Sequence, residues 1–249
     1  MSPLTDVSMQ APPVPSDADH VLTWPQQGAA LPLSLWLMPE RAVYWPQQGV
    51  LFVADVHVGK AAVFRARGLP VPQGTTTATL QRLSHAVTRT RARTLVVLGD
   101  FLHARESLAP ATLAALRAWR SAHAELTCII VQGNHDRHAG APPPDLRMAV
   151  HPGAWRAGAL VGVHDANEVD EADEAAPFSA ADATPMLQLA GHVHPVVTLR
   201  DRLDHLRLPC FVLQDRTLTL PAFGDFTGGF EETRPDARVF VAAHRVVAL

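Results

Sequence analysis

The chain has 249 residues, of which 47% are hydrophobic and 18% charged, a composition that fits a folded globular protein and excludes a fibrous one. Its net charge of -3 supplies no general attraction to nucleic acid. No apolar run approaches the about 20 residues that cross a bilayer, and the N-terminus lacks the pattern of a secretory signal. We therefore expect a cytoplasmic protein that does not contact a membrane.

The length fits one large domain with a substantial core. Residues 1–20 show no periodicity and predict a disordered N-terminal tail, which leaves residues 21–249 as a single domain. Within it, residues 165–185 carry seven acidic and no basic side chains, which predicts an inserted, solvated acidic loop. Cys128 and Cys210 each lie in an apolar segment and are expected to be buried free thiols.

Apolar runs and helical periodicity alternate in the first half of the chain. Residues 50–54, 95–98 and 128–131 predict buried strands, with amphipathic helices between them at 75–91 and 108–124. This alternation is typical of a parallel sheet built from βαβ units. A hairpin is expected over residues 42–54. Shorter apolar runs follow and predict a second sheet packed on the first, at 160–163, 186–190, 196–199, 210–213, 218–220 and 239–242.

Five of these apolar runs end in side chains that can bind a metal ion. Loops at the carboxyl ends of strands are where open α/β sheets carry their chemistry. Divalent ions of manganese, iron, zinc or magnesium accept carboxylate, imidazole and amide oxygen ligands. The seven candidate ligands are Asp55, His57, Asp100, Asn134, His164, His192 and His194.

Seven such groups are about the number that two adjacent ions need when one carboxylate bridges them, and Asp100 is the bridging candidate. Two divalent ions would leave a net positive cavity, which suits a phosphate ester. The ions would polarise the phosphoryl oxygens, and a hydroxide bridging them would attack phosphorus. The sequence thus predicts a two-metal phosphoesterase.

Other polar residues supply candidate roles around this centre. His135 stands next to a ligand without being needed as one, so it is free to protonate the leaving oxygen. Asp136 is a candidate to orient His135 or another nearby group. Basic residues that could bind a phosphate substrate are Lys60, Arg65, Arg67, Arg105 and Arg137. The histidines interpreted as ordinary core or surface residues are His85, His103, His123, His138, His205 and His244.

The motifs Asp-x-His, Gly-Asp, Gly-Asn-His-Asp, His and Gly-His-x-His, in this order over residues 55–194, resemble the calcineurin-like metallophosphoesterase superfamily. The resemblance implies an α/β fold, a four-layer α-β-β-α sandwich of two mixed sheets. It also implies that Asp55, His57, Asp100 and His194 hold one metal. Asp100, Asn134, His164 and His192 would hold the other, and His135 would be the acid.

Within that superfamily, four segments are similar to the bacterial ligase-associated DNA damage response metallophosphoesterases. They are Asp55-Val56-His57-Val58-Gly59-Lys60, His192-Val193-His194-Pro195, Leu208-Pro209-Cys210-Phe211 and the segment from Leu220 to Gly229, Leu-Pro-Ala-Phe-Gly-Asp-Phe-Thr-Gly-Gly. This resemblance implies a manganese-dependent phosphodiesterase that processes DNA as an endonuclease, with a DNA ligase and a helicase as partners.

Two alternatives stay open. The acidic loop and the negative net charge would favour a phosphoesterase of small nucleotides or metabolites, because an acidic loop beside the site would repel a long polyanion. A scaffold protein with a decayed site is the other alternative, although every ligand position here is filled. The native metal, the physiological substrate, the preference for monoesters or diesters, and a homo-oligomeric state are left open as well.

Overall fold

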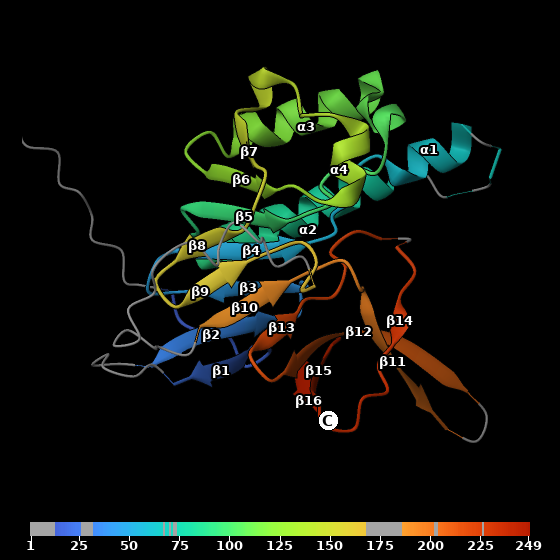
Figure 1. Cartoon of the computed structure of the whole chain (residues 1–249). Coiled ribbons are helices and arrows are strands. Elements are labelled where there is room, and N and C mark those ends of the chain that lie inside the picture. The colour runs from blue at the N-terminus through green and yellow to red at the C-terminus, as the bar shows by residue number, and fades with distance from the viewer. Residues whose placement is uncertain are drawn as a thin grey trace, which may run out of the picture.

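A computed structural model describes residues 13–25, 32–66, 68–69, 71, 74–167, 186–201, 204–225 and 227–249. The first of its two sheets contains strands that follow one another in chain order (Figure 1). These strands are β1 (His20–Trp24), β2 (Leu33–Met38), β3 (Ala42–Trp45), β4 (Val50–Ala54), β5 (Thr94–Leu98), β6 (Thr127–Val131) and β7 (Met148–His151). Neighbours from β1 to β4 are antiparallel, and neighbours from β4 to β7 are parallel.

The change from antiparallel to parallel follows from the connections, since parallel neighbours need a crossover whereas antiparallel ones can be joined by a hairpin. Helices supply the crossovers. They are α1 (Lys60–Ala66), α2 (Thr75–Thr90), α3 (Pro110–Ala122) and α4 (Asn134–Ala139), with 3-10 turns η1 (Arg105–Leu108) and η2 (Pro144–Leu146). The predicted helix over 75–91 is confirmed as α2. The one over 108–124 is shorter, because η1 precedes it and Pro110 opens α3 at a position that tolerates a missing N–H.

The second sheet is mixed and has the order β14-β11-β12-β13-β10-β9-β8, with β15 paired to β12 and β16 to β15. Its strands are β8 (Trp155–Ala157), β9 (Leu160–Gly162), β10 (Leu187–Ala190), β11 (Pro195–Arg200), β12 (His205–Gln214), β13 (Thr217–Thr219), β14 (Phe230–Glu231), β15 (Arg238–Ala242) and β16 (Val246–Ala248). Strand β10 lies between two parallel neighbours, β9 and β13.

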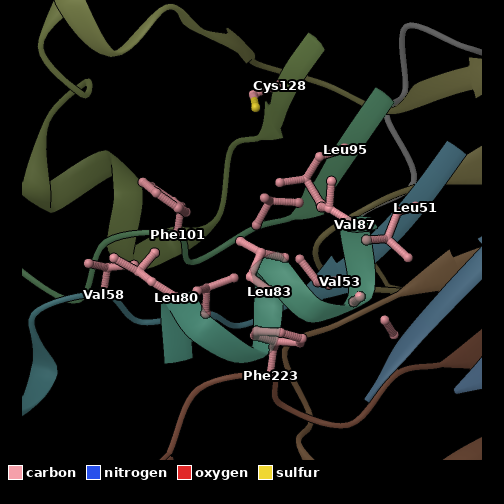
Figure 2. Close-up of a cluster of buried hydrophobic side chains, with 14 of the residues drawn as sticks. Leu51, Val53, Val58, Leu80, Leu83, Val87, Leu95, Phe101, Cys128 and Phe223 are labelled. Atoms are coloured by element: carbon pink, nitrogen blue, oxygen red, sulfur yellow. The ribbon is translucent and has the colours of Figure 1, made fainter. Parts of the chain in front are cut away.

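Alternate residues of β4 show how the layers stack. Leu51 and Val53 belong to the core that contains α2 and α3, whereas Phe52 and Ala54 belong to the core shared with the second sheet. Figure 2 shows the first core, with Leu83 of α2 beside the β4 residues Leu51 and Val53. Because β4 is covered on both faces, it is apolar throughout and buried at every position. The α/β fold class with two mixed sheets is thereby confirmed.

Several expectations concern segments that the structure describes only in part. Of the acidic loop 165–185, only residues 165–167 are described. Of the predicted tail 1–20, residues 1–12 lie outside the described part. The rest leads into β1 through a turn in which Asp19 accepts hydrogen bonds from Arg89. Cys128 and Cys210 are buried free thiols, as expected. Among the described residues no helix is long and apolar enough to span a membrane.

Candidate metal centre at the strand ends

The two sheets bring their strand ends to one place. Strands β4, β5 and β6 are parallel neighbours, and so are β9 and β10 in the second sheet. The carboxyl ends of parallel strands lie at the same edge of a sheet, so the loops that follow these strands can converge. The structure brings together all seven predicted ligands at these ends, namely Asp55, His57, Asp100, Asn134, His164, His192 and His194.

The backbone at these residues is in an unusual conformation. Nine described non-glycine residues have a positive φ, and five of them are candidate ligands: Asp55, His57, Asp100, His192 and His194. Left-handed backbone costs on the order of 1–3 kcal/mol at a non-glycine residue and persists where surrounding structure enforces it. Left-handed residues are concentrated at the strand ends. This indicates a site in which the direction of the side chains is maintained at a cost in stability.

Glycines allow the elements to approach closely around the candidate ligands. A Cβ atom on Gly99, which has a φ of 75°, would lie 2.0 Å from Nδ1 of His164. A Cβ atom on Gly133 would lie 2.3 Å from Oδ1 of Asp100. The absence of a side chain at Gly99 therefore leaves room for His164, which follows β9 of the second sheet. The absence of one at Gly133 leaves room for the Asp100 carboxylate.

The first group of ligand atoms comprises Asp55, His57 and His194, whose ligand atoms lie within 4.8 Å of one another. Asp55 Oδ1 and His194 Nε2 are 3.3 Å apart. These two atoms and His57 Nε2 are buried and form no hydrogen bond within the described part of the chain. Leaving buried polar atoms without a partner is costly. A cation bound by all three atoms would remove that cost, so the residues present fit a metal ion.

The second group comprises Asp55, Asp100 and His164. His164 Nε2 lies 3.6 Å from Asp100 Oδ1 and 2.8 Å from Asn134 Oδ1. His192 also approaches His164: the distance between His192 Nδ1 and His164 Nε2 is 3.1 Å. On its other side, His164 Nδ1 lies 3.2 Å from the Leu98 carbonyl, a contact that orients the ring.

The carboxylate between the two groups was predicted to be Asp100. Asp100 does lie between them, because its carboxylate is 3.8 Å from His57 Nε2 and 3.6 Å from His164 Nε2. Asp55, however, is the residue common to both groups. Both carboxylates are therefore placed to contact two ions.

Burial shifts the pKa values of three groups at the centre. Burial, and then the positive charge of Lys60, lowers the pKa of His57 far below its usual value. Burial raises the pKa of Asp100, with His164 opposing and Asp55 adding to the increase. Burial also lowers the pKa of Lys60, which the charges of Asp100 and Asp55 partly restore. A neutral imidazole and an ionised carboxylate are the forms that bind metals, so a bound cation would stabilise both.

His135 lies at the solvent side of this centre. Its side chain is 39% exposed, and its Nε2 is 4.0 Å from Asp100 Oδ2. Its Nδ1 lies 2.9 Å from the carbonyl oxygen of His103. A carbonyl only accepts hydrogen bonds, so Nδ1 carries a proton and Nε2 is the atom directed at the centre.

Asp136 does not orient His135. Its buried carboxylate accepts hydrogen bonds from the backbone N–H groups of Leu102 at 2.9 Å, Gly133 at 3.1 Å and Phe101 at 3.3 Å. It thus ties the loop after β5 to the start of α4. The sequence reading placed Gly-Asn-His-Asp in a strand-end loop, but these residues open α4, with Asp136 near its N-terminus.

Four of the five predicted substrate-binding residues lie on helices or a 3-10 turn of the described part of the chain. Lys60 is half-buried at the start of α1, close enough to Asp100 and Asp55 for their negative charges to raise its pKa against the effect of burial. Arg65 in the last turn of α1 and Arg137 of α4 are exposed. Arg105, at the start of η1, is exposed, and η1 packs beside both helices. Arg67 lies outside the described residues.

His103 belongs to the site, which the sequence reading missed. Its ring stacks on His135 with centroids 4.8 Å apart and meets His57 edge-on at 5.2 Å. Its carbonyl holds the His135 ring, as described above. The available signal was its position three residues after Asp100, in a strand-end loop like those that carry the other ligands.

No protein-family model and no curated protein matches the sequence. Among solved structures, the Pseudomonas putida nuclease MPE is 39% identical with a TM-score of 0.74, over 92% of this chain and 100% of that one. The E. coli phosphoesterase YfcE is 12% identical with a TM-score of 0.37, over 77% of this chain and 86% of that one.

The identity to the P. putida protein extends over nearly the whole of both chains. The chain belongs to the calcineurin-like metallophosphoesterase superfamily, and its activity is that of a metal-dependent phosphoesterase.

Proposed function

We propose that this phosphoesterase hydrolyses phosphodiester bonds in DNA and acts as an endonuclease. The observation that carries the proposal is the set of three buried ligand atoms that form no hydrogen bond in the described part of the chain, on Asp55, His57 and His194, at the edge where both sheets end. A centre of this kind suits a phosphate ester because bound divalent ions leave it positively charged. The 39% identity to a nuclease favours a polynucleotide as the ester.

In this proposal, Asp55, His57, Asp100 and His194 bind one ion, and Asp100, Asn134, His164 and His192 bind the other. When bound, the two ions would polarise the phosphoryl oxygens and activate a water molecule as the nucleophile. Asp55 belongs to both candidate groups, so it would be a ligand shared by the two ions, which the ligand assignment by resemblance did not include.

His135 is the proposed general acid. Its Nε2 faces the centre from the exposed side, where a leaving group would depart. The His103 carbonyl and the stacked His103 ring restrict the His135 ring to this direction. Transfer of a proton by a positioned imidazole contributes typically about 10²–10⁴-fold to a rate.

Manganese is the proposed metal. The ligand set contains carboxylate, amide and imidazole groups and no thiolate, which suits manganese as well as iron, zinc or magnesium. Metal analysis of protein purified without added metal, followed by reconstitution with each ion separately, identifies the metal that restores most activity.

Lys60, Arg65 and Arg137 are proposed to bind the DNA backbone. Lys60 is closest to the centre, whereas Arg65 and Arg137 extend from α1 and α4 toward solvent. A role in DNA repair together with a DNA ligase and a helicase is the biological setting that we propose from the family resemblance.

A small-nucleotide phosphoesterase is the second candidate. The net charge of -3 and the acidic run within residues 165–185 favour it, because both oppose the approach of a polyanion. Deletion of residues 168–182 separates the two. Faster cleavage of DNA would identify the run as a barrier in a DNA enzyme, and an unchanged low rate on DNA with high activity on nucleotides would favour this second candidate.

The test of the DNA proposal is manganese-supplemented cleavage of a single-stranded oligonucleotide. We expect each of Lys60→Gln, Arg65→Gln and Arg137→Gln to raise KM for the oligonucleotide. Each lost phosphate contact should also make binding less sensitive to salt: the slope of the logarithm of the binding constant against the logarithm of the salt concentration should become shallower by about 0.7. Arg117→Gln is the matched control, since Arg117 forms an exposed ion pair with Asp145 on the helical layer. Equal KM values for all four variants would count against DNA binding by these residues.

A further inference from the structure

A second polar cavity adjoins the metal centre. Its volume is about 220 Å³, smaller than the roughly 300–1,000 Å³ of pockets that enclose a drug-sized ligand. The wall is formed by β11, β12, the turn before β3 and the segment before β14, and its charged lining residues are Arg41, Arg207 and Asp225. His194 lines this cavity and is also 3.3 Å from Asp55 at the metal centre.

The cavity and the centre share structural support as well as His194. The Thr227 carbonyl accepts a hydrogen bond from His194 Nδ1 at 3.1 Å. Gly224 donates its N–H to the Asp55 carbonyl at 3.0 Å. A ligand in the cavity would therefore lie directly beside the metal centre, as a neighbouring group of the same substrate would.

The charges around the cavity favour an anion. Its lining holds Arg41 and Arg207 against one carboxylate, Asp225, a balance of one positive charge. Asp225 is also shared with Arg82, at 3.3 Å, and its contact with Arg41 is long at 3.5 Å. Glu231, near Arg207, already accepts hydrogen bonds from Thr198. Arg207 also donates a hydrogen bond to the Gly229 carbonyl, and Arg41 makes a long one of 3.5 Å to the Ala222 carbonyl. These acceptors use only part of the five N–H donors that each arginine offers.

Arg41 is also in a position that an arginine rarely takes. It ends the turn between β2 and β3 with a φ of 65°, a left-handed conformation in which three-residue hairpin loops prefer glycine. Burial, and then the like charge of Arg82, lowers the pKa of Arg41, against the effect of Asp225. The backbone conformation belongs to the turn, whereas burial and the neighbouring Arg82 act on the guanidinium, which an anion in the cavity would stabilise.

We propose that this cavity binds the phosphate of the nucleotide next to the scissile bond, through Arg41 and Arg207. Arginine offers a planar, two-donor grip that fits a phosphodiester. The apolar wall of Pro195, Val196 and Pro209 is suited to the sugar beside that phosphate. The proposal rests on the proposed DNA function and specifies it further: the enzyme would need at least two successive phosphates for full efficiency.

The experiment compares two chromogenic substrates with manganese present. One is the p-nitrophenyl ester of thymidine monophosphate, which carries only the scissile phosphate. This ester is made in two forms, on the 5′- and on the 3′-hydroxyl of thymidine. The extended substrates carry one further phosphodiester-linked thymidine on the free 3′- or 5′-hydroxyl of these two esters, so that the extension runs in either direction along the chain. The measured quantity is the ratio of kcat/KM for the extended and unextended esters.

We expect a ratio of about ten or more in the natural protein for one direction of extension, since a hydrogen-bonded charge contributes about 1.5 kcal/mol or more. Arg207→Gln should bring the ratio close to one, and Arg207→Lys should give an intermediate value. Arg207 is exposed, so its variants should fold even if Arg41→Gln does not. Arg117→Gln should keep the ratio of the natural protein.

The outcomes separate the two proposals. Turnover of the unextended ester with a ratio that Arg207→Gln and Arg41→Gln leave unchanged would overturn the cavity assignment and leave the phosphodiesterase intact. Absence of turnover on every ester, with any divalent metal, would overturn the proposed function and the cavity assignment with it.

Discussion

The backbone N–H of His135 donates a hydrogen bond of 2.9 Å to Oδ1 of Asp100. The residue proposed as acid is thus attached to a proposed metal ligand through its main chain, while its side chain is held by His103. This attachment requires the start of α4 to lie against the end of β5. A change that separates these elements should therefore disturb metal binding and proton transfer together.

Gly133→Ala is the change that should separate them. The new Cβ would lie 2.3 Å from Asp100 Oδ1 and 2.5 Å from the Asp100 backbone nitrogen, and such overpacking costs roughly 1–3 kcal/mol. We expect loss of most phosphodiesterase activity and weaker manganese binding by calorimetry. Gly140→Ala is the control, because its φ of 87° strains the backbone but no atom lies within 4 Å of the added Cβ. Normal manganese affinity in Gly133→Ala would show that the close approach is not needed.

Asp136→Asn should destabilise the fold. The buried carboxylate accepts three backbone hydrogen bonds, from Phe101, Leu102 and Gly133. An amide would turn an N–H₂ group toward N–H donors, leaving buried groups unsatisfied at a cost of about 1–3 kcal/mol each. Urea unfolding should show the loss, whereas Asp145→Asn, at an exposed ion pair with Arg117, should change little. Equal unfolding midpoints would contradict the structural role of Asp136.

Manganese should stabilise the protein against heat. An ion that binds only the folded state adds about 2.7 kcal/mol when present at 100 times its Kd, which is roughly 5–10 °C in Tm for a chain of this size. The shift should be largely lost in Asp100→Ala and kept in Asp145→Ala. A shift of the same size in both variants would mean that the ion binds elsewhere.

Both cysteines should be unreactive in the folded protein. Burial raises the pKa of Cys128 to about 11 and that of Cys210 to about 12. Only the thiolate reacts, and at pH 8 a thiol of pKa 11 is roughly 0.1% ionised. Titration with a disulfide reagent at pH 8 should detect both thiols only after denaturation. The native reaction should accelerate as pH rises, and rapid native labelling at pH 8 would contradict the burial.

The sequence predicts the strands and the ligands because both depend on local pattern. The β4, β5 and β6 strands are continuous apolar runs, since the helices cover one face and the second sheet the other. The ligands then follow from their positions after those runs. Strands β1 and β2 were not predicted, although β2 is an apolar run and is almost wholly buried.

What the sequence could not supply depends on contacts between distant segments. Asp136 contacts the backbone of Leu102, 34 positions away, and these partners are not visible in a motif. The cavity needs Arg41 from a hairpin turn to meet Arg207 from β12 across the two sheets. The contact of His103 with His57 joins segments 46 positions apart, so the sequence offered only its position shortly after Asp100 as a signal.

The most direct test of a two-metal phosphodiesterase is hydrolysis of bis-p-nitrophenyl phosphate with added manganese, in the natural protein and in Asp100→Ala and His135→Ala. We predict turnover by the natural protein and nearly complete loss in Asp100→Ala. His135→Ala should lower kcat only a little on this ester, because p-nitrophenolate leaves without a proton, and by about 10²-fold or more on an oligonucleotide, whose leaving oxygen is an alkoxide. Asp145→Ala should retain the activity. Equal turnover by the natural protein and Asp100→Ala, or no turnover by the natural protein with any divalent metal, would contradict the account.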